Sequence, residues 1–231
     1  NASPTFCGEA GVGMAPSVAR LIREADVILA VNVRFGENST GGYTLLDVPS
    51  PRQKIIHVHS DADEIGKIYR PVLGIPSGPT AFAAALGRLD PIKGPWSDWR
   101  AEGRAAYEAA LTVPDLPSPV DMGKVCAHLR DRLPADAVIT NGAGNFAVWA
   151  GKFIPFRPGM RHLAPQAGAM GYGLPAAIAA KVADPSRTVV CFAGDGDFQM
   201  TCPELATALQ AGAQPILLLL NNGIYGTIRA H

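Results

Sequence analysis

The chain has no excess of either charge, and it has few charged residues of any kind. Its 231 residues contain 20 Lys+Arg and 20 Asp+Glu, which gives a formal net charge of zero and a charged fraction of 17%. Nucleic-acid-binding proteins usually show a basic excess or a Lys/Arg-rich stripe, so we expect no nucleic-acid partner. The low charge content and a mean hydropathy of +0.13 suggest that a partner covers part of the surface, or that the chain belongs to a larger protein.

Long hydrophobic runs are missing as well. The longest, residues 215–220, has the length of a strand, so we expect neither a transmembrane helix nor a membrane partner. The N-terminus has no basic segment followed by an apolar one, so no signal peptide is visible and we expect a cytoplasmic protein. The chain does not begin with Met, and we expect its natural start to lie elsewhere.

The four cysteines are scattered, without a C-x-x-C pair. Disulfide frameworks and zinc sites need closely spaced pairs, so we expect four reduced thiols, as in a cytoplasmic protein. Cys191 lies within the apolar run at residues 189–192, where we expect it to pack as a small hydrophobic side chain. The other three cysteines are Cys7, Cys126 and Cys202.

Apolar runs alternate with helical patterns along most of the chain. Strands are predicted at residues 27–32, 54–59, 137–140, 188–193 and 216–220. Helices are predicted at residues 14–24, 79–86, 122–132, 170–182 and 203–211. Fully apolar strands separated by helices are typical of parallel sheets that are covered by helices on both faces, so we expect an α/β protein.

Prolines divide this pattern into two parts. The stretch between Pro91 and Pro119 has no strand pattern and carries one Ala/Glu/Arg-rich helical segment, at residues 99–111. We interpret residues 93–117 as a connector with one helix. It joins two α/β units, one at residues 1–92 and one at residues 118–231.

Three loops rich in Gly and Asn follow predicted strands, at residues 140–145, 193–197 and 220–226. In parallel sheets, ligands bind outside the carboxyl ends of the strands. The first loop fits a G-x-G-x-x-A pattern with Gly142 and Gly144. A dinucleotide site would need an acid about 20 residues further on, but the stretch between Asp136 and Asp184 contains no Asp or Glu. The pattern therefore favours a glycine-lined phosphate loop over a dinucleotide site.

The second and third loops suggest a metal site. An apolar strand runs directly into Gly194-Asp195-Gly196, and Asn222 follows the next apolar strand. Alone, Asp195 could simply cap a helix. Adjacent parallel strands would instead bring the Asp195 carboxylate and the Asn222 amide oxygen together. Carboxylate, amide and carbonyl oxygens suit Mg²⁺, which shares its coordination shell with phosphates, and the nearby glycine loop offers N–H groups to those phosphates.

The motifs in these loops resemble those of a known family. The Gly-Asp-Gly and Asn-Asn motifs at this spacing resemble the thiamine diphosphate (ThDP) motif of the ThDP-dependent decarboxylases and carboligases. The segments 168–177, 194–200 and 221–226 are most similar to the acetolactate synthase branch. In the first half, Arg34-Phe35, Thr40-Gly41 and residues 55–67 resemble the middle domain of the same enzymes. The resemblance covers nearly the whole chain.

The resemblance implies a role for each matching residue. Asp195 and Asn222 would be side-chain ligands of Mg²⁺, and the carbonyl of Ile224 would be a third protein ligand. The diphosphate would be lined by Gly144, Asn145 and Phe146 on one side and by Gly196 and Asp197 on the other. The remaining cofactor-binding residues implied by the resemblance are Gly142, Gly194, Tyr225 and Gly226.

Two further residues would act on the reactive part of the cofactor. The Gly168 carbonyl would accept a hydrogen bond from the 4-amino group of ThDP. Met170 would be the apolar wedge that bends the cofactor into a V shape, which brings the 4-amino nitrogen near the acidic thiazolium carbon. The alternative for Met170 is a side chain that fills a gap in a core.

Two positions depart from the family pattern. Members often carry Gln-His where this chain has Asn145-Phe146, so a polar contact is lost. Acetolactate synthases often read His-Ile-Asp-Ile-Asp where this chain has His57-Val-His-Ser-Asp61, so His59 replaces an acid associated with the adenosine end of the flavin. FAD binding is therefore doubtful, and the alternative for His57 and His59 is a strand-end pair with no ligand.

The resemblance also implies what lies outside this chain. Family members have an N-terminal pyrimidine-binding domain with a catalytic Glu, and the two halves of the cofactor site come from different subunits. We therefore expect an internal part of a longer protein that is inactive alone, and a homodimer or homotetramer for the full-length parent.

These observations lead to one prediction with two alternatives. The fold is two Rossmann-like units, a partial middle domain at residues 1–92 and a partial diphosphate-binding domain at residues 118–231. The parent enzyme would use ThDP and Mg²⁺ to decarboxylate a 2-keto acid such as pyruvate and to join the product to a second carbonyl. The alternatives are a decarboxylase of the benzoylformate type, and a non-catalytic module that holds a nucleotide or a partner subunit.

Overall fold

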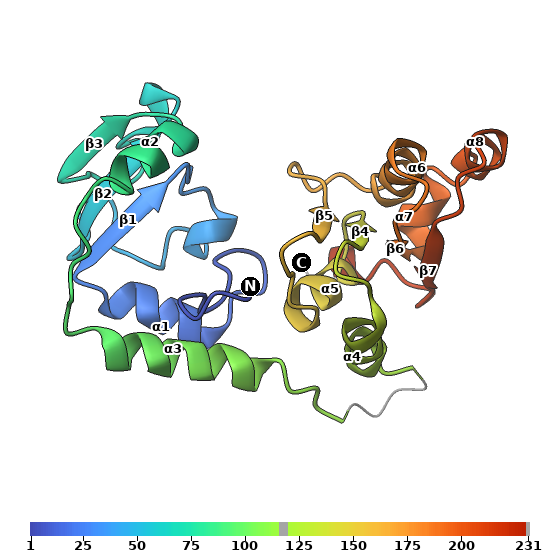
Figure 1. Ribbon diagram of the computed structural model, residues 1–231, viewed down its shortest axis with the longest axis horizontal. Coiled ribbons are helices and arrows are strands. Elements are labelled where there is room, and N and C mark those ends of the chain that lie inside the picture. The colour runs from blue at the N-terminus through green and yellow to red at the C-terminus, as the bar shows by residue number, and fades with distance from the viewer. Residues whose placement is uncertain (116–119, 230–231) are drawn as a thin grey trace. The chain divides into compact units, whose positions relative to one another are not determined.

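The computed structural model describes residues 1–115 and 120–229, and the chain forms two compact units (Figure 1). The N-terminal unit is Pro4–Glu108, and the C-terminal unit comprises Asn1–Ser3 and the chain from Ala109 onward. The described residues do not include 116–119, where the predicted connector ends and the predicted second domain begins. They also do not include the final His231.

The N-terminal unit contains a three-stranded parallel sheet in the order β1-β2-β3. Its elements are α1 (Pro16–Glu24), β1 (Val27–Val31), η1 (Asn38–Thr40), β2 (Lys54–His59), η2 (Ala62–Glu64), β3 (Leu73–Pro76), α2 (Pro79–Leu86) and α3 (Ser97–Ala110). The predicted strands at 27–32 and 54–59 are confirmed. The sequence pattern missed β3, because its four residues include a glycine and a proline and show no alternation.

The two faces of this sheet are not equally covered. On one face, Ile28 and Ile55 pack with α1 and with the buried ring of Tyr69. The opposite face carries an aligned row across the strands, Leu29–Ile56–Leu73. Leu29 is 45% and Leu73 50% exposed, and α2 contacts β2 without burying any residue of its own. The parallel α/β architecture is as predicted. This second face is only partly covered, because Val58 is fully buried while Leu29 and Leu73 are about half exposed.

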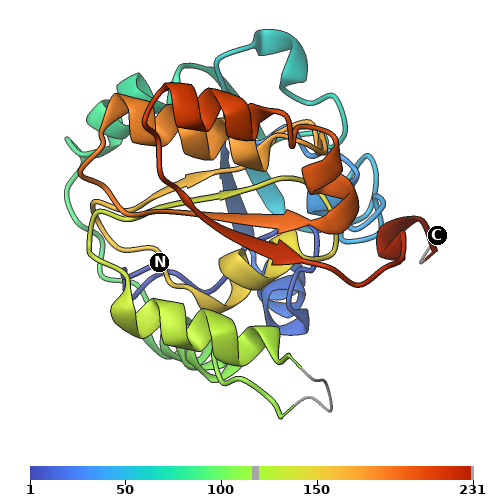
Figure 2. The same cartoon turned by 90° about the vertical axis from the view of Figure 1, so that its right-hand side faces the viewer.

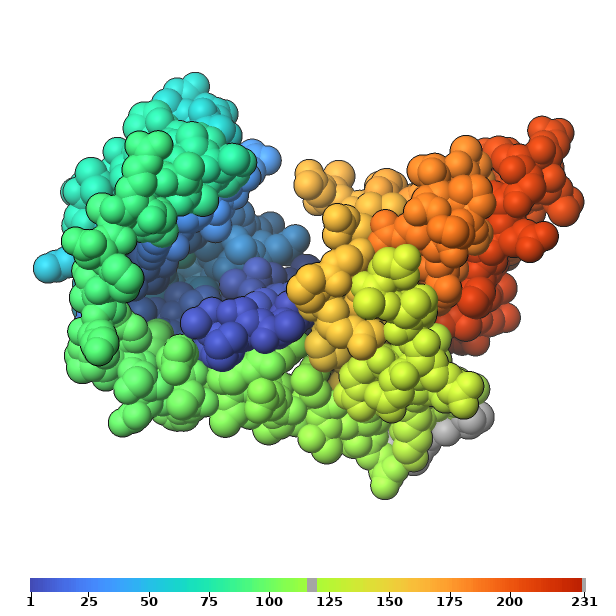
Figure 3. Space-filling model, viewed as in Figure 1, coloured from blue at the N-terminus to red at the C-terminus, as the bar shows by residue number. Residues whose placement is uncertain are grey.

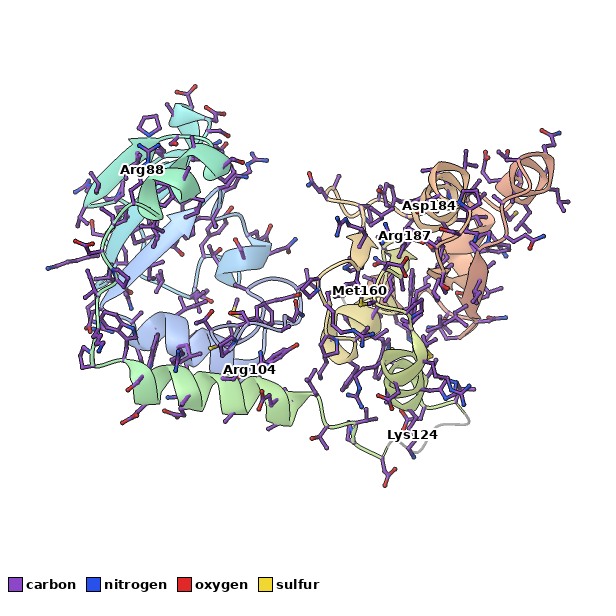
Figure 4. All side chains as sticks on the ribbon, in the orientation of Figure 1. Arg88, Arg104, Lys124, Met160, Asp184 and Arg187 are labelled. Carbon is purple, nitrogen blue, oxygen red and sulfur yellow. The ribbon has the colours of Figure 1, made fainter. Side chains whose placement is uncertain are left out.

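Helix α3 packs against the N-terminal unit. Arg104, labelled in Figure 4, donates to the Phe6 carbonyl at 3.2 Å, and the Phe6 and Tyr107 rings meet edge to face at 5.0 Å. Arg20 of α1 pairs with Glu102 at 2.6 Å. Figure 3 shows the N-terminal segment, in dark blue, lying against the green helix. From the sequence alone this helix is assigned to a connector, because the residues that it contacts lie far from it in the sequence.

The C-terminal unit contains a four-stranded parallel sheet in the order β5-β4-β6-β7. Figure 2 shows α6 and α8 on one side of this sheet and α4 and α5 on the other. The elements are α4 (Met122–Arg132), β4 (Val138–Asn141), α5 (Ala147–Phe153), β5 (Arg161–Leu163), α6 (Gly173–Ala183), β6 (Val189–Gly194), α7 (Asp195–Gln199), α8 (Glu204–Gln210), β7 (Ile216–Leu220) and α9 (Gly226–Arg229).

The core of the C-terminal unit explains why its strands are apolar throughout. All six residues of β6 are buried, and alternate side chains enter two different clusters. Val190 and Phe192 pack with α4 and α5, whereas Val189 and Cys191 pack with Ala177 of α6. A strand covered on both faces needs apolar side chains on both, which is the pattern that predicted it. The C-terminal sheet thus has helices on both faces, as predicted.

Among the described residues, no helix is long and apolar enough to cross a membrane.

The burial of the cysteines predicts how they react. None of the four is disulfide-bonded, and Cys126 and Cys191 are fully buried. Burial raises the pKa of the Cys126 thiol to about 12 and that of Cys191 to about 11, so neither forms the reactive thiolate near neutral pH. We expect a maleimide reagent to modify Cys7 and Cys202 in the native protein and all four cysteines only after denaturation. Intact mass measures this, and four rapid additions to the native protein would contradict the described packing.

Candidate functional site

The candidate site lies at the carboxyl ends of β4, β6 and β7. Asn141 pairs with Phe192 and Gly194 pairs with Leu220, so the three Gly- and Asn-rich loops begin at the same edge of the sheet. A pocket of about 980 Å³ opens there. Its apolar end is formed by residues of α4, α5 and β7, including Trp149 and Leu218.

The pocket gathers nearly all of the residues that the sequence analysis selected. The predicted residues that line it are Gly144, Asn145, Phe146, Gly168, Met170, Gly194, Asp195, Gly196, Asp197, Asn222, Ile224, Tyr225 and Gly226. Gly142 is the exception. A Cβ on Gly142 would collide with the Asp197 carboxylate, so Gly142 lies behind that side chain and allows its close approach.

The Asp195 carboxylate links the loops after β6 and β7. Gly194 is the N-cap residue of α7, and Asp195 Oδ2 accepts a hydrogen bond from Gly223 N at 3.1 Å. Gly223 has a φ of +63°, which glycine adopts without strain. Ile224 N donates to Asn222 Oδ1 at 3.1 Å, so the turn also fixes the Asn222 amide. The structure therefore places the loop that carries Asn222 and Ile224 against Asp195.

The chemistry of these groups fits a hard cation. Asp195 supplies a carboxylate, Asn222 an amide oxygen and Ile224 a backbone carbonyl, which together form an all-oxygen set. Within residues 1–115 and 120–229, no group of three or more His, Cys, Asp or Glu side chains is close enough to hold a metal. A set with one carboxylate suits Mg²⁺, which keeps waters and phosphate oxygens in its shell.

Asn145 and Phe146 also line the pocket. Asn145 Oδ1 accepts a hydrogen bond from Thr227 Oγ1 at 3.1 Å. A Cβ on Gly144 or on Gly194 would lie 2.8 Å from the Phe146 ring, so only glycine fits beneath the ring at either position. Phe146 thus packs between two of the loops and supports the glycine-lined part of the pocket.

Met170 and Tyr225 border the pocket beside Gly196. A Cβ on Gly196 would lie 3.7 Å from Met170 Cε and 3.5 Å from Tyr225 Cε1. The Met170 residue is 41% exposed and Tyr225 is 76% exposed. Met170 therefore borders the pocket and is not buried in a core of this unit.

Asp197 binds backbone groups of two other loops. Asp197 is 2% exposed, and its Oδ1 accepts hydrogen bonds from Gly171 N at 2.7 Å and from Ala143 N at 3.3 Å. Desolvation raises the pKa of the Asp197 carboxyl, and the hydrogen bonds from Gly171 and Ala143 oppose the rise. The sequence analysis placed Asp197 beside the diphosphate. Oδ1 of the Asp197 side chain thus binds backbone groups of the protein itself.

The ends of β1 and β2 in the N-terminal unit form a separate polar cluster. His57 and His59 are buried, with ring centroids 6.2 Å apart. A ring nitrogen of His57 lies 2.8 Å from the Val33 carbonyl oxygen, and His59 Nδ1 accepts a hydrogen bond from Asp61 N at 3.0 Å. Arg34 contacts Glu64 at 3.3 Å. These side chains bind protein groups, which favours the interpretation of the two histidines as a strand-end pair without a ligand.

Comparison with known proteins agrees with this geometry. Two family profiles match the chain. One is described as the central domain of thiamine pyrophosphate enzymes, over residues 1–86. The other is their C-terminal TPP-binding domain, over residues 142–231, and thiamine pyrophosphate is another name for ThDP. The predicted family is confirmed.

Individual relatives are acetolactate synthases. The chain is 30% identical over 228 residues to acetolactate synthase isozyme 2 large subunit of Escherichia coli, covering 98% of this chain and 40% of that protein. It is 35% identical over 222 residues to an acetolactate synthase of Arthrospira platensis, covering 90% of this chain and 36% of that protein. The chain thus spans about 40% of the length of the curated relatives it matches.

Proposed function

Because the chain belongs to the thiamine pyrophosphate enzyme family, with its central and TPP-binding domains, we propose that it serves an acetolactate synthase-like reaction. In this reaction a 2-keto acid such as pyruvate is decarboxylated and its acyl carbon is joined to a second carbonyl compound. The observation that carries the proposal is a single pocket that gathers Asp195, the Asn222 loop and Met170. The names of the relatives support the acetolactate synthase branch.

Each wall of the pocket has a task in this proposal. Asp195, Asn222 and the Ile224 carbonyl would hold Mg²⁺, which would supply positive charge for the diphosphate. Backbone N–H groups at Gly144 and Gly196 receive the remaining phosphate oxygens. When bound, ThDP supplies an acidic thiazolium carbon that adds to the keto group and accepts the electrons released with CO₂.

The chain's own residues then orient the reactive end of the cofactor. The Gly168 carbonyl accepts a hydrogen bond from the 4-amino group, and this fixes the aminopyrimidine. The Met170 side chain projects beside Gly196 and supports the bend of the cofactor. Both residues border the pocket at the edge where it meets solvent in this chain.

We also propose that a second subunit closes the site. Tyr225 and Ile228 line the pocket and are exposed, as is Ile224. Apolar side chains gathered at one rim suit burial at a protein interface. The protein is proposed to act as a cytoplasmic homodimer or homotetramer whose partner copy covers this rim.

The products formed from pyruvate test the proposed reaction. With ThDP and Mg²⁺ in excess, the full-length parent protein should consume pyruvate, release CO₂ and form a product in which a new carbon–carbon bond joins two substrate molecules. Release of a free aldehyde alone would favour the simple decarboxylase. Cofactor binding without any consumption of 2-keto acids would favour the non-catalytic alternative.

The His57–His59 cluster predicts a flavin-free protein. His59 is buried and bound to Asp61, and it occupies the position where acetolactate synthases often have an acid. We expect the purified protein to lack the visible absorbance of oxidised FAD. Stoichiometric flavin in the preparation would contradict this and would strengthen the synthase over the decarboxylase.

A further inference from the structure

Two side chains from α7 and the turn that follows it hold the peptide groups of Gly171. Asp197 Oδ1 accepts a hydrogen bond from Gly171 N at 2.7 Å. Thr201 Oγ1 donates to the Gly171 carbonyl oxygen at 2.9 Å. Both backbone polar groups of one residue are therefore bound by side chains four positions apart. We refer to this arrangement of Asp197, Thr201 and Gly171 as the Gly171 clamp.

The clamp is tight as well as polar. Gly171 is buried and has a φ of +82°, which only glycine adopts without strain. A Cβ at this position would lie 3.1 Å from Thr201 Cγ2 and 3.2 Å from Met200 Cβ. Asp197 is a buried carboxylate, and such a group is tolerated when N–H donors satisfy it. The backbone of Gly171 is thus fixed by shape and by hydrogen bonds.

The clamp lies directly beside Met170. On the other side of Met170, Gly168 has a φ of +66°, and a Cβ there would have open space around it. Gly168 N donates to the Pro165 carbonyl at 3.1 Å, a contact within the same loop. On the C-terminal side of Met170, the nearest contacts that tie this loop to another segment are those of Gly171. Two residues further on, Thr140 Oγ1 donates to the Gly173 carbonyl at 2.8 Å.

The same Asp197 oxygen also reaches the glycine-lined loop. Asp197 Oδ1 accepts a hydrogen bond from Ala143 N at 3.3 Å, and the carboxylate packs against Gly142. One oxygen atom therefore joins the loop that carries Met170 to the loop proposed to hold the diphosphate. The wedge and the phosphate loop are positioned by a common group.

We propose that Asp197 and Thr201 are positioning residues that set Met170 relative to the diphosphate loop, an inference that rests on the proposed function. They do not touch the reacting atoms. Misplacement of a reacting group by about 1 Å costs roughly 100-fold in rate, so loss of the Thr201 bond to Gly171 should lower turnover while cofactor binding persists.

Variants of the clamp residues, made in the full-length parent protein, test this. Thr201→Val keeps the shape of the side chain but removes the hydroxyl, and we expect kcat to fall about tenfold or more, with the Kd for ThDP within about threefold of wild type. Thr201→Ser keeps the hydroxyl and should restore turnover. Asp197→Asn keeps an acceptor oxygen and should retain more activity than Asp197→Ala. Thr207→Val, on the exposed side of α8, is the matched control.

Amide hydrogen exchange separates this inference from the proposed function. In the cofactor-free protein, Thr201→Val and Asp197→Ala should accelerate exchange in the peptide that contains Gly171, and Thr207→Val should not. If the exchange rate of this peptide is unchanged in both clamp variants, or if kcat is unchanged in Thr201→Val, the inference that the clamp positions Met170 is wrong. A full-length wild-type protein that binds ThDP but turns over no 2-keto acid contradicts the proposed function instead, and the exchange rates then decide the clamp alone.

Discussion

Replacing Asp195 by Ala should abolish Mg²⁺-dependent binding of ThDP. The variant loses the one anionic group of the proposed metal site, and Mg²⁺ gives up its waters reluctantly. Changes to groups that only support a metal ligand already cost about 10–100-fold in affinity, so loss of the ligand itself should cost more than about 100-fold. Titration of the protein with ThDP at fixed Mg²⁺, followed by calorimetry, measures the loss.

Asp131→Ala is the matched control for this experiment. Asp131 is an exposed acid near the end of α4, paired with its neighbour Arg130 at 3.4 Å, and it does not line the pocket. The control should bind ThDP like wild type. If Asp195→Ala did so too, Asp195 would not be a metal ligand, and its hydrogen bond to Gly223 would be a purely structural link.

Replacing Met170 by Ala in the full-length parent protein should lower turnover far more than it lowers cofactor affinity. The side chain borders the pocket beside Gly196, whereas the groups proposed for the diphosphate and Mg²⁺ lie on other loops. Loss of about 2–3 kcal/mol of alignment in the transition state corresponds to roughly a 30–150-fold lower rate. Steady-state kinetics with varied ThDP separate kcat from the apparent affinity.

Met200→Ala controls for the general effect of removing a methionine side chain. Met200 is exposed in the same part of the unit and does not line the pocket. Its replacement should leave kcat near the wild-type value. A Met170→Ala variant with full turnover would show that the wedge is not needed and that Met170 is simply a rim residue.

Much of the fold was predictable because its strands are short apolar runs. Residues 189–194 enter two cores at once, and this requirement leaves a continuous hydrophobic pattern in the sequence. The edge strand β5 was missed because its three residues show no such pattern. Helix α6 begins at Gly173, three residues later than predicted, because Gly171 adopts a left-handed conformation.

The residues of the site were predictable because parallel strands end at one edge of a sheet. Asp195 and Asn222 follow strands that turned out to be neighbours, β6 and β7, and this adjacency brings their loops together. The sequence analysis did not find the task of the Asp197 side chain or of Thr201. Their partners are backbone groups of Gly171 and Ala143, and backbone partners leave no residue-specific signal in a sequence.

The same limit applies to helix α3. Its sequence shows a helix, but the carbonyl of Phe6 and the side chain of Arg20, which bind it, are far away in the sequence. Only the folded unit shows that the helix packs there. Composition and periodicity predict elements, whereas side-chain contacts between distant segments require the structure.

The most direct test of the central claim is a calorimetric titration of the protein with ThDP, with Mg²⁺ present and again after its removal by a chelator. We expect saturable binding of ThDP with Mg²⁺ and loss of this binding without the metal. The reason is that Asp195 and Asn222 line the pocket and would bind the diphosphate only by way of the cation. Equal binding with and without a divalent cation, or no binding at high protein concentration with Mg²⁺ in excess, would contradict it.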